Sequence, residues 1–148
     1  MAQTSSSSEA PIAQGNAFEV LDASALLALV YRERGVERVQ AAIRRGALIS
    51  IVNWAESLSR MSELGEVVDV AVPRVKTQAA ALGSLQIVPF EERDAIEAAR
   101  LRGPTRHLGL SLADRACLAL GRLRRLPVLT TDRAWRSLHI SVRIEVIR

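Results

Sequence analysis

The sequence contains a single cysteine, Cys117, and no long apolar run. One cysteine cannot form a disulfide within the chain, and no other residues at metal-ligand spacing accompany it, which excludes a disulfide scaffold and a zinc motif. No segment has the length of a membrane-spanning helix, and no basic start followed by an apolar stretch indicates a secretory signal. We therefore expect a cytoplasmic protein in which Cys117 is a small core residue.

Aromatic residues and lysine are also scarce. Five residues are aromatic and Lys76 is the only lysine, whereas nineteen residues are arginine. So few aromatics argue against a stacking platform for single-stranded nucleic acid. The region from Arg93 to Arg148 carries twelve arginines and five acidic residues, a net charge of +7, which favours a polyanionic partner held through its phosphates.

The chain does contain enough apolar residues to form one domain. It has 148 residues, of which 49% are hydrophobic and 24% are charged. Residues 1–16 are polar, rich in serine and without a pattern, so we predict a disordered tail there. The folded domain is expected over residues 17–148.

Short apolar strands alternate with helical segments along that domain. This order predicts the α/β class, as a three-layer α/β/α domain with a central, mostly parallel sheet of four or five strands. Strands are expected at 18–21, 47–52, 85–90 and 127–130, with a further edge strand at 142–147. Helices are expected at 23–34, 36–45, 53–64, 66–82, 91–101 and 108–121, where Pro73 starts a new helix or kinks the fourth and Gly121 ends the last.

Four acidic residues are expected at one edge of this sheet. Asp22 follows the first strand, Glu56 lies one turn into the helix after the second, and Asp132 follows the fourth. Asp114 lies in the first turn of its own helix, on the apolar side. Because ligands of open α/β sheets bind at the carboxyl ends of the strands, we expect all four side chains to point to one site.

Carboxylates gathered in this way repel one another. Two like charges about 4 Å apart cost roughly 4 kcal/mol at an effective dielectric constant of 20. Such a cluster persists only if protons are shared or a divalent cation binds, and oxygen ligands select Mg²⁺ or Mn²⁺. An ion of this kind activates a water molecule and polarises a phosphoryl oxygen, so the pattern favours metal-assisted hydrolysis of phosphodiester bonds.

Each acidic residue also has an ordinary structural interpretation. Ser111 and Asp114 are close to a helix capping box, and Asn53 with Glu56 forms a similar pattern. Asp22 and Asp132 are suitable helix N-caps. The placement of all four acids at one edge favours the metal site over four independent caps.

Four segments of the sequence resemble, in order and spacing, the motifs of PIN-domain ribonucleases. The resemblance covers about residues 18–148, and the compact size is most similar to VapC toxins of type II toxin–antitoxin systems. The serine-rich start departs from the family pattern but includes no motif residue. The segments are Val-Leu-Asp-Ala-Ser-Ala-Leu-Leu (20–27), Asn-Trp-Ala-Glu (53–56), Leu-Ser-Leu-Ala-Asp-Arg (110–115) and Leu-Thr-Thr-Asp-Arg-Ala-Trp (129–135).

The resemblance implies an endoribonuclease that depends on Mg²⁺ or Mn²⁺. It further implies an RNA substrate, a homodimer and a cognate antitoxin protein that inserts into the active-site groove. By position, it makes Asp22, Glu56, Asp114 and Asp132 the catalytic and metal-binding residues.

The resemblance also suggests helpers around this quartet. Ser24 and Thr130 match hydroxyl positions that support the acidic residues, although turns and strand ends favour such residues in any case. Arg106 and Arg115 are candidates for contact with RNA phosphates, and a solvated loop or helix face is the simpler interpretation of both.

Two alternatives stay open at this point. One is a PIN-domain nuclease that processes RNA without being a toxin, and the other is a binding module that keeps the fold but not the chemistry. Other carboxylate enzymes fit less well. A haloacid-dehalogenase phosphatase requires a second Asp where this chain has Ser24, a receiver domain requires a late lysine, and glycine-rich phosphate loops are absent.

Overall fold

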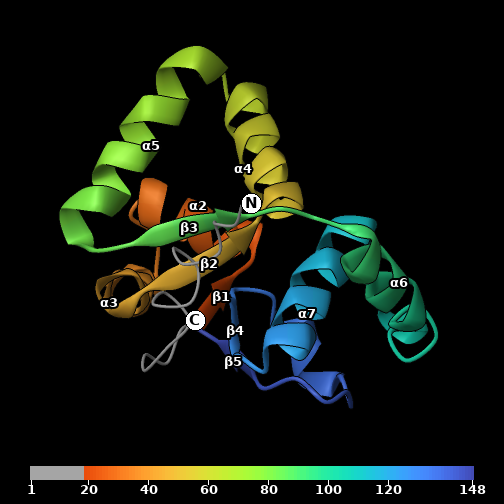
Figure 1. The fold of residues 1–148 in the computed structure, drawn as a ribbon. Coiled ribbons are helices and arrows are strands. Elements are labelled where there is room, and N and C mark those ends of the chain that lie inside the picture. Colours follow the sequence, from red (N-terminus) through yellow and green to blue (C-terminus); the bar gives the residue numbers. More distant parts are fainter. Residues whose placement is uncertain (1–18) are drawn as a thin grey trace, which may run out of the picture.

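The computed structural model describes residues 19–148, which form a parallel sheet between two layers of helices (Figure 1). The strand order is β3–β2–β1–β4–β5, and every neighbouring pair is parallel. The carboxyl ends of all five strands therefore lie along one edge. The strands are β1 (Glu19–Leu21), β2 (Ala47–Ser50), β3 (Leu85–Val88), β4 (Val128–Thr130) and β5 (Ile144–Val146).

The helices divide between the two faces of the sheet, which confirms the predicted three-layer α/β/α architecture. In Figure 1, the helices α2 and α3 and the hairpin of α4 and α5 lie apart from the pair α6 and α7. The helices are α2 (Ala23–Val30), α3 (Val36–Arg45), α4 (Ile51–Glu63), α5 (Val68–Leu82), α6 (Glu92–Arg100) and α7 (Leu112–Arg124), with short 3₁₀ turns η1 (Arg106–Leu108) and η2 (Arg133–Ser137).

Alternation along the strands builds two apolar cores. Leu21, Ile49 and Leu129 face the first core, which the helices α2 to α5 cover. Their neighbours Val20, Leu48 and Val128 face the second core, under α6 and α7. The central strands therefore bury apolar side chains on both faces, as expected for a parallel sheet covered by helices on each side.

The second strand is shorter than the sequence suggests. The apolar run 47–52 predicts a strand to residue 52, but β2 ends at Ser50 and α4 begins at Ile51. The Ser50 hydroxyl accepts a hydrogen bond from the backbone N–H of Val52 at 3.1 Å, so Ser50 is the N-cap of α4. The cap prediction that begins this helix at Asn53 is therefore wrong.

Two further boundaries differ because of backbone conformation. The predicted helix 23–34 ends at Val30, and the chain then turns through Arg32, with φ of 52°, and Gly35, with φ of 99°. Pro73 lies inside a single helix that begins at Val68, rather than at the start of a new one. Proline cannot donate a hydrogen bond to the carbonyl four residues earlier, that of Asp69, and both residues are exposed, which gives solvent access to this turn of the helix.

Gly121 does not end the helix that carries Asp114. The helix α7 begins at Leu112, after the N-cap Ser111, and continues to Arg124. A Cβ atom at Gly121 would lie 2.5 Å from Cγ2 of Val128 in β4. Glycine is therefore present to let the helix approach the strand closely, and the turn itself is made by Arg125, with φ of 57°.

The remaining predictions on the fold have mixed outcomes. The predicted edge strand 142–147 is confirmed as β5 at 144–146, parallel to β4. The predicted tail over residues 1–16 lies outside the described residues, and the domain boundary at residue 17 stays a prediction. Among residues 19–148, no helix is long and apolar enough to cross a membrane.

Candidate active site at the carboxyl edge of the sheet

Asp22 is buried at the end of the central strand β1, where α2 begins. Its carboxylate accepts three hydrogen bonds, from the backbone N–H of Ala25 at 2.8 Å and from the hydroxyls of Ser24 at 2.6 Å and Thr130 at 2.5 Å. The pKa of Asp22 is raised from 3.8 to about 6, chiefly by burial and to a smaller extent by the charge of Asp114, although the hydrogen bonds lower it. Asp22 is thus held rigidly in a position that is unfavourable for an isolated charge.

The two hydroxyls that hold Asp22 also join β1 to β4. The Ser24 hydroxyl accepts from the backbone N–H of Thr131 at 2.9 Å, and the Thr130 hydroxyl accepts from the backbone N–H of Asp132 at 3.0 Å. The chain after β4 is therefore fixed against the chain after β1. The structure places Ser24 and Thr130 where the predicted supporting role requires them, and that role stays a prediction.

Glu56 and Asp114 come together because α4 lies against α7. The buried amide of Asn53, one turn before Glu56, donates to the backbone carbonyl of Ala113 at 2.9 Å and to Oε1 of Glu56 at 3.5 Å. Glu56 is exposed, but partial loss of solvent raises its pKa, and the charge of Asp114 raises it further. The two carboxylates therefore act on each other across the helix contact.

Asp114 has the ordinary role that its sequence pattern predicts as well. Its Oδ2 accepts from the backbone N–H of Ser111 at 3.1 Å, and the Ser111 hydroxyl accepts from the backbone N–H of Asp114 at 3.1 Å. This reciprocal pair is a capping box. One oxygen of Asp114 is engaged by the cap, which fixes the side chain and leaves the other oxygen for a ligand.

Asp22, Glu56 and Asp114 all lie near enough to the buried thiol of Cys117 for their charges to affect its pKa. Burial raises the pKa of this thiol well above its usual value, and the charges of the three carboxylates add to the effect. Asp132 lies on the other side of Thr130, is exposed, and accepts from the backbone N–H of Ala134 at 2.9 Å as the cap of η2. Three of the predicted acids thus converge, and the fourth borders them.

The residues present suit a hard divalent cation. All the donors are carboxylate oxygens, and the negative charge of Asp114 raises the pKa values of Asp22 and Glu56, so a cation would relieve the repulsion. The buried Oδ1 of Asn53 has no hydrogen-bond partner among the described residues. Within the same residues, however, no three His, Cys, Asp or Glu side chains form a ready-made metal site.

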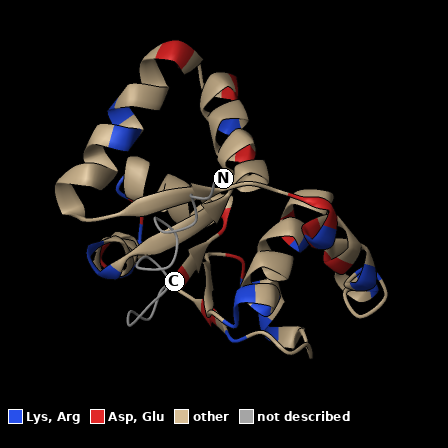
Figure 2. Ribbon diagram, viewed as in Figure 1, with Lys and Arg blue, Asp and Glu red and all other residues tan. Residues whose placement is uncertain are grey.

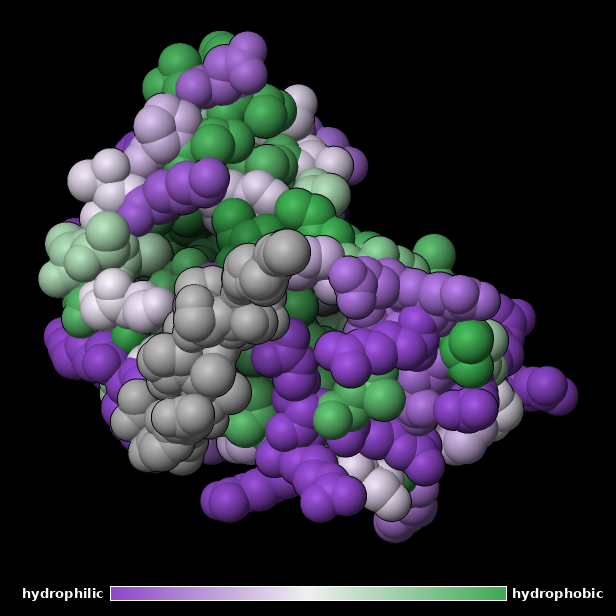
Figure 3. Space-filling view, in the orientation of Figure 1, coloured by the Kyte–Doolittle hydropathy of each residue, from purple (hydrophilic) through white to green (hydrophobic). Residues whose placement is uncertain are grey.

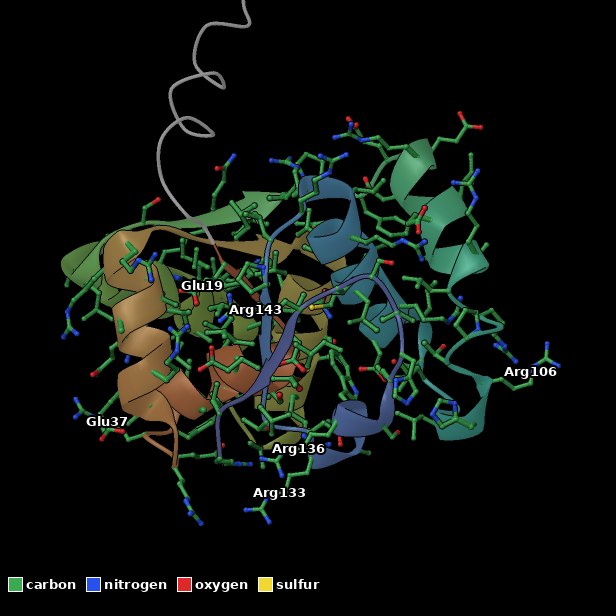
Figure 4. All side chains as sticks on the ribbon, turned by 90° about the horizontal axis from the view of Figure 1, so that it is seen from below. Glu19, Glu37, Arg106, Arg133, Arg136 and Arg143 are labelled. Carbon is green, nitrogen blue, oxygen red and sulfur yellow. The ribbon has the colours of Figure 1, made fainter. Side chains whose placement is uncertain are left out.

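The two arginines proposed from the sequence have different surroundings. Nη1 of Arg115 donates to the backbone carbonyl of Ala98 at 2.9 Å, which commits this side chain to the contact between α7 and α6. The phosphate contact of Arg115 stays a prediction. Arg106 is exposed at the start of η1, well separated from Arg133, which follows Asp132 (Figure 4).

Sequence reasoning missed the part that Asn53 plays. It treated Asn53 as a cap for the helix of Glu56, whereas the structure shows it as a buried bridge from α4 to α7. The available signal was a polar residue in an otherwise apolar segment directly after a strand. Such a residue requires a partner, and the partner proves to be another helix.

A scan against protein-family models matches residues 20–140 to the PIN domain. The chain belongs to the PIN domain family. This match confirms the family that the four acidic segments resemble. No curated protein sequence gives a significant match.

Solved structures share the PIN fold over nearly their full length. VapBC2 from Rickettsia felis, bound to a promoter DNA fragment, has a TM-score of 0.64 and 13% identity, covering 86% of this chain and 97% of that chain. FitAcB from Neisseria gonorrhoeae has a TM-score of 0.60 and 22% identity, covering 86% and 96%. DNA-bound VapBC from Salmonella typhimurium has a TM-score of 0.63 and 17% identity, covering 87% and 97%. Because these sequence identities are low, the similarity shows a shared fold only.

Proposed function

We propose that this PIN domain is a divalent-metal-dependent endoribonuclease that acts as the toxin of a toxin–antitoxin pair. The observation that carries the proposal is the convergence of Asp22, Glu56 and Asp114, whose charges act on one another at the carboxyl ends of the strands. Asp132 borders the same site through Thr130. This arrangement is costly without a function, because loss of solvent and the charge of Asp114 both disfavour the ionised forms of Asp22 and Glu56.

Mg²⁺ or Mn²⁺ bound by these carboxylates would supply a polarised phosphoryl oxygen and a water of lowered pKa. The chain's own residues prepare the site. Ser24 and Thr130 fix both oxygens of Asp22, so the carboxylate keeps one orientation. Asn53 holds α4 against α7 and thereby sets the position of Glu56 relative to Asp114.

The proposed partners are a cognate antitoxin and a second copy of the chain. Solved structures with this fold include a toxin–antitoxin complex from Klebsiella pneumoniae, with a TM-score of 0.61 and 18% identity. A surface suited to a protein partner lies on the hairpin of α4 and α5, where Leu64, Val67 and Val70 are each more than 60% exposed. Figure 3 shows apolar surface around this hairpin and hydrophilic surface over α6 and α7.

Cleavage of structured RNA by the purified chain tests the nuclease. We expect cleavage with Mg²⁺ or Mn²⁺, none with a chelator, and only background with Asp114→Asn. Asparagine keeps an oxygen for the capping box while removing the charge, so the variant should fold. Cleavage that survives chelation, or survives Asp114→Asn, would contradict the metal mechanism.

Expression in cells separates the toxin from the other two interpretations. Induction should stop growth, and Asp114→Asn should relieve the effect. Cleavage in vitro without any effect on growth would favour an RNA-processing nuclease. A calorimetric titration that detects no binding of divalent ions would favour a module without catalysis. Sequencing of the cleaved RNA ends after induction would identify the substrate.

A further inference from the structure

A shallow hollow of about 530 Å³ lies beside the candidate active site. Its lining consists of Arg34, Thr131, Asp132, Arg133 and Arg148. The side chains of this lining, three arginines and one carboxylate, sum to a charge of +2. These arginines come from three distant parts of the sequence: the turn after α2, the start of η2 and the segment after β5. No local pattern in the sequence therefore predicts that they lie together.

The hollow shares a wall with the site of Asp22. The backbone N–H of Thr131, which lines the hollow, donates to the Ser24 hydroxyl at 2.9 Å, and that hydroxyl donates to Asp22 at 2.6 Å. Asp132 lines the hollow and also belongs to the predicted acidic quartet. An extended ligand that reaches Asp22 therefore has the hollow as its neighbouring position.

Two of the three arginines are available to a ligand. Arg34 and Arg133 are exposed, and within residues 19–148 neither forms an ion pair with an Asp or Glu side chain. Nε of Arg133 donates to the backbone carbonyl of Arg148 at 3.2 Å, which leaves its terminal nitrogens free among these residues. Arg148 is 3.2 Å from Glu33, a partly exposed ion pair that a stronger anion can displace.

We propose that this hollow binds a phosphate of the RNA strand next to the scissile bond, with Arg34 and Arg133 as the principal ligands and Arg148 as a third. The assignment rests on the proposed nuclease function and adds the path of the substrate. A guanidinium group can bind two phosphate oxygens at once. The positively charged hollow would bind the RNA backbone, and the acidic site beside it would cleave it. The strand would leave the acidic site across the chain after β4 and not across the Arg106 loop.

Equilibrium binding to a non-cleaving protein tests the proposal. The probe is a short, fluorescently labelled, single-stranded RNA of mixed sequence, and the parent protein carries Asp114→Asn. We expect the pair Arg34→Gln and Arg133→Gln to weaken binding about 10-fold or more and to reduce the slope of log K against log salt by about 1.4, roughly 0.7 for each lost contact to a single strand. The matched control is the pair Arg45→Gln and Arg102→Gln, which removes the same charge from exposed positions outside the hollow and should change the affinity less than 3-fold.

Kinetic assays of RNA cleavage, with the arginine variants made in a protein that retains Asp114, separate this proposal from the proposed function. There the Arg34 and Arg133 pair should raise KM with little change in kcat, since these residues bind RNA away from the reacting atoms. If the wild type cleaves RNA and the double variant Arg34→Gln, Arg133→Gln has the same KM, the hollow does not bind RNA, and the proposed nuclease function still stands. Binding that depends on the pair, in a wild-type protein that never cleaves, would support the hollow and reject the nuclease.

Three other outcomes would also overturn the proposal. A loss of affinity in the control equal to that in the pair would mean that RNA responds only to total charge. A loss of affinity for a purified antitoxin, with RNA affinity unchanged, would assign the hollow to a protein partner. A single Arg106→Gln variant that weakens RNA binding more than the pair does would place the strand over the α6–α7 loop.

Discussion

Asp22 shows how one residue combines a structural cost with a chemical use. Its carboxylate is buried, yet three donors hold it in place and no cation among residues 19–148 forms an ion pair with it. The sequence correctly predicts its position at the end of a strand. The magnitude of its burial could not be predicted, because it depends on β4 and Thr130, which are more than a hundred residues away.

The raised pKa of Asp22 gives a prediction about stability and pH. The folded chain binds this proton more tightly than the unfolded chain, so the contribution of Asp22 to the free energy of unfolding falls as pH rises from about 4 to about 6. Above about pH 6, this effect has lowered the free energy of unfolding by roughly 3 kcal/mol relative to its value below pH 4. We expect Asp22→Asn, in chelator, to raise the free energy of unfolding by roughly 1–3 kcal/mol near neutral pH, and this gain to shrink towards pH 4.

Urea unfolding at several pH values measures this effect. The control is Asp69→Asn, which neutralises an exposed carboxylate and should change the free energy of unfolding by less than about 1 kcal/mol at any pH. Mg²⁺ should raise the melting temperature of the wild type more than that of Asp22→Asn. An equal loss of stability in Asp22→Asn at both ends of the pH range would show that its hydrogen bonds outweigh the buried charge.

At the scale of elements, the contact between α4 and α7 decides whether two of the acids meet. The sequence indicates both helices and places Glu56 and Asp114 in their first turns, but periodicity does not tell which helices touch. Asn53 makes the contact specific, because its amide reaches the carbonyl of Ala113 from a fully buried position. The boundary at Ser50 was missed for a related reason, since a single hydroxyl cap outweighs the strand propensity of the residues after it.

We expect Asn53→Ala to weaken the metal site through this contact. The variant removes the hydrogen bond to the carbonyl of Ala113, which should lower the free energy of unfolding by about 0.5–1.5 kcal/mol. Loss of the orientation of Glu56 relative to Asp114 should weaken Mg²⁺ binding about 10–100-fold. Urea unfolding and calorimetric metal titration measure the two effects separately.

Ser59→Ala is the matched control on the same helix. Its exposed hydroxyl bonds only to the carbonyl of Ala55 in its own helix, at 2.9 Å, so neither stability nor metal affinity should change appreciably. Unchanged Mg²⁺ affinity in Asn53→Ala, despite lower stability, would restrict Asn53 to a role in packing.

At the scale of the whole molecule, one arginine joins three elements on the side of the sheet covered by α3. Arg38 of α3 pairs with Glu19 at the start of β1, labelled in Figure 4, and donates from Nε to Glu145 of β5 at 2.7 Å. Glu19 is only 4% exposed. The central strand and the edge strand are thus held by the same guanidinium. Figure 2 shows charged residues gathered on α3, α6 and α7 and sparse along α5.

We expect Arg38→Met to destabilise the fold by leaving Glu19 buried without a partner. The loss in the free energy of unfolding should be about 2–3 kcal/mol, less than for a fully buried pair because Arg38 and Glu145 are partly exposed. Arg60→Met, which removes the exposed pair with Glu63, should cost less than about 1 kcal/mol.

Chemical denaturation of a double variant shows whether the loss comes from the stranded charge. Arg38→Met with Glu19→Gln should recover part of the stability that Arg38→Met alone loses, because no unpaired charge then remains in the interior. Strictly additive losses in the double variant would mean that Arg38 acts through packing of its aliphatic chain.

The direct junction of β2 and α4 restricts how this protein can change. No residue separates Ser50 from Ile51, so the sheet and the helix share one rigid frame. Inserting a single residue there would rotate everything downstream by about 100° around the helix axis and carry Glu56 away from Asp114. The longer connection between α6 and α7 carries no such constraint, and we expect length variation among related sequences to accumulate there and to be rare at this junction.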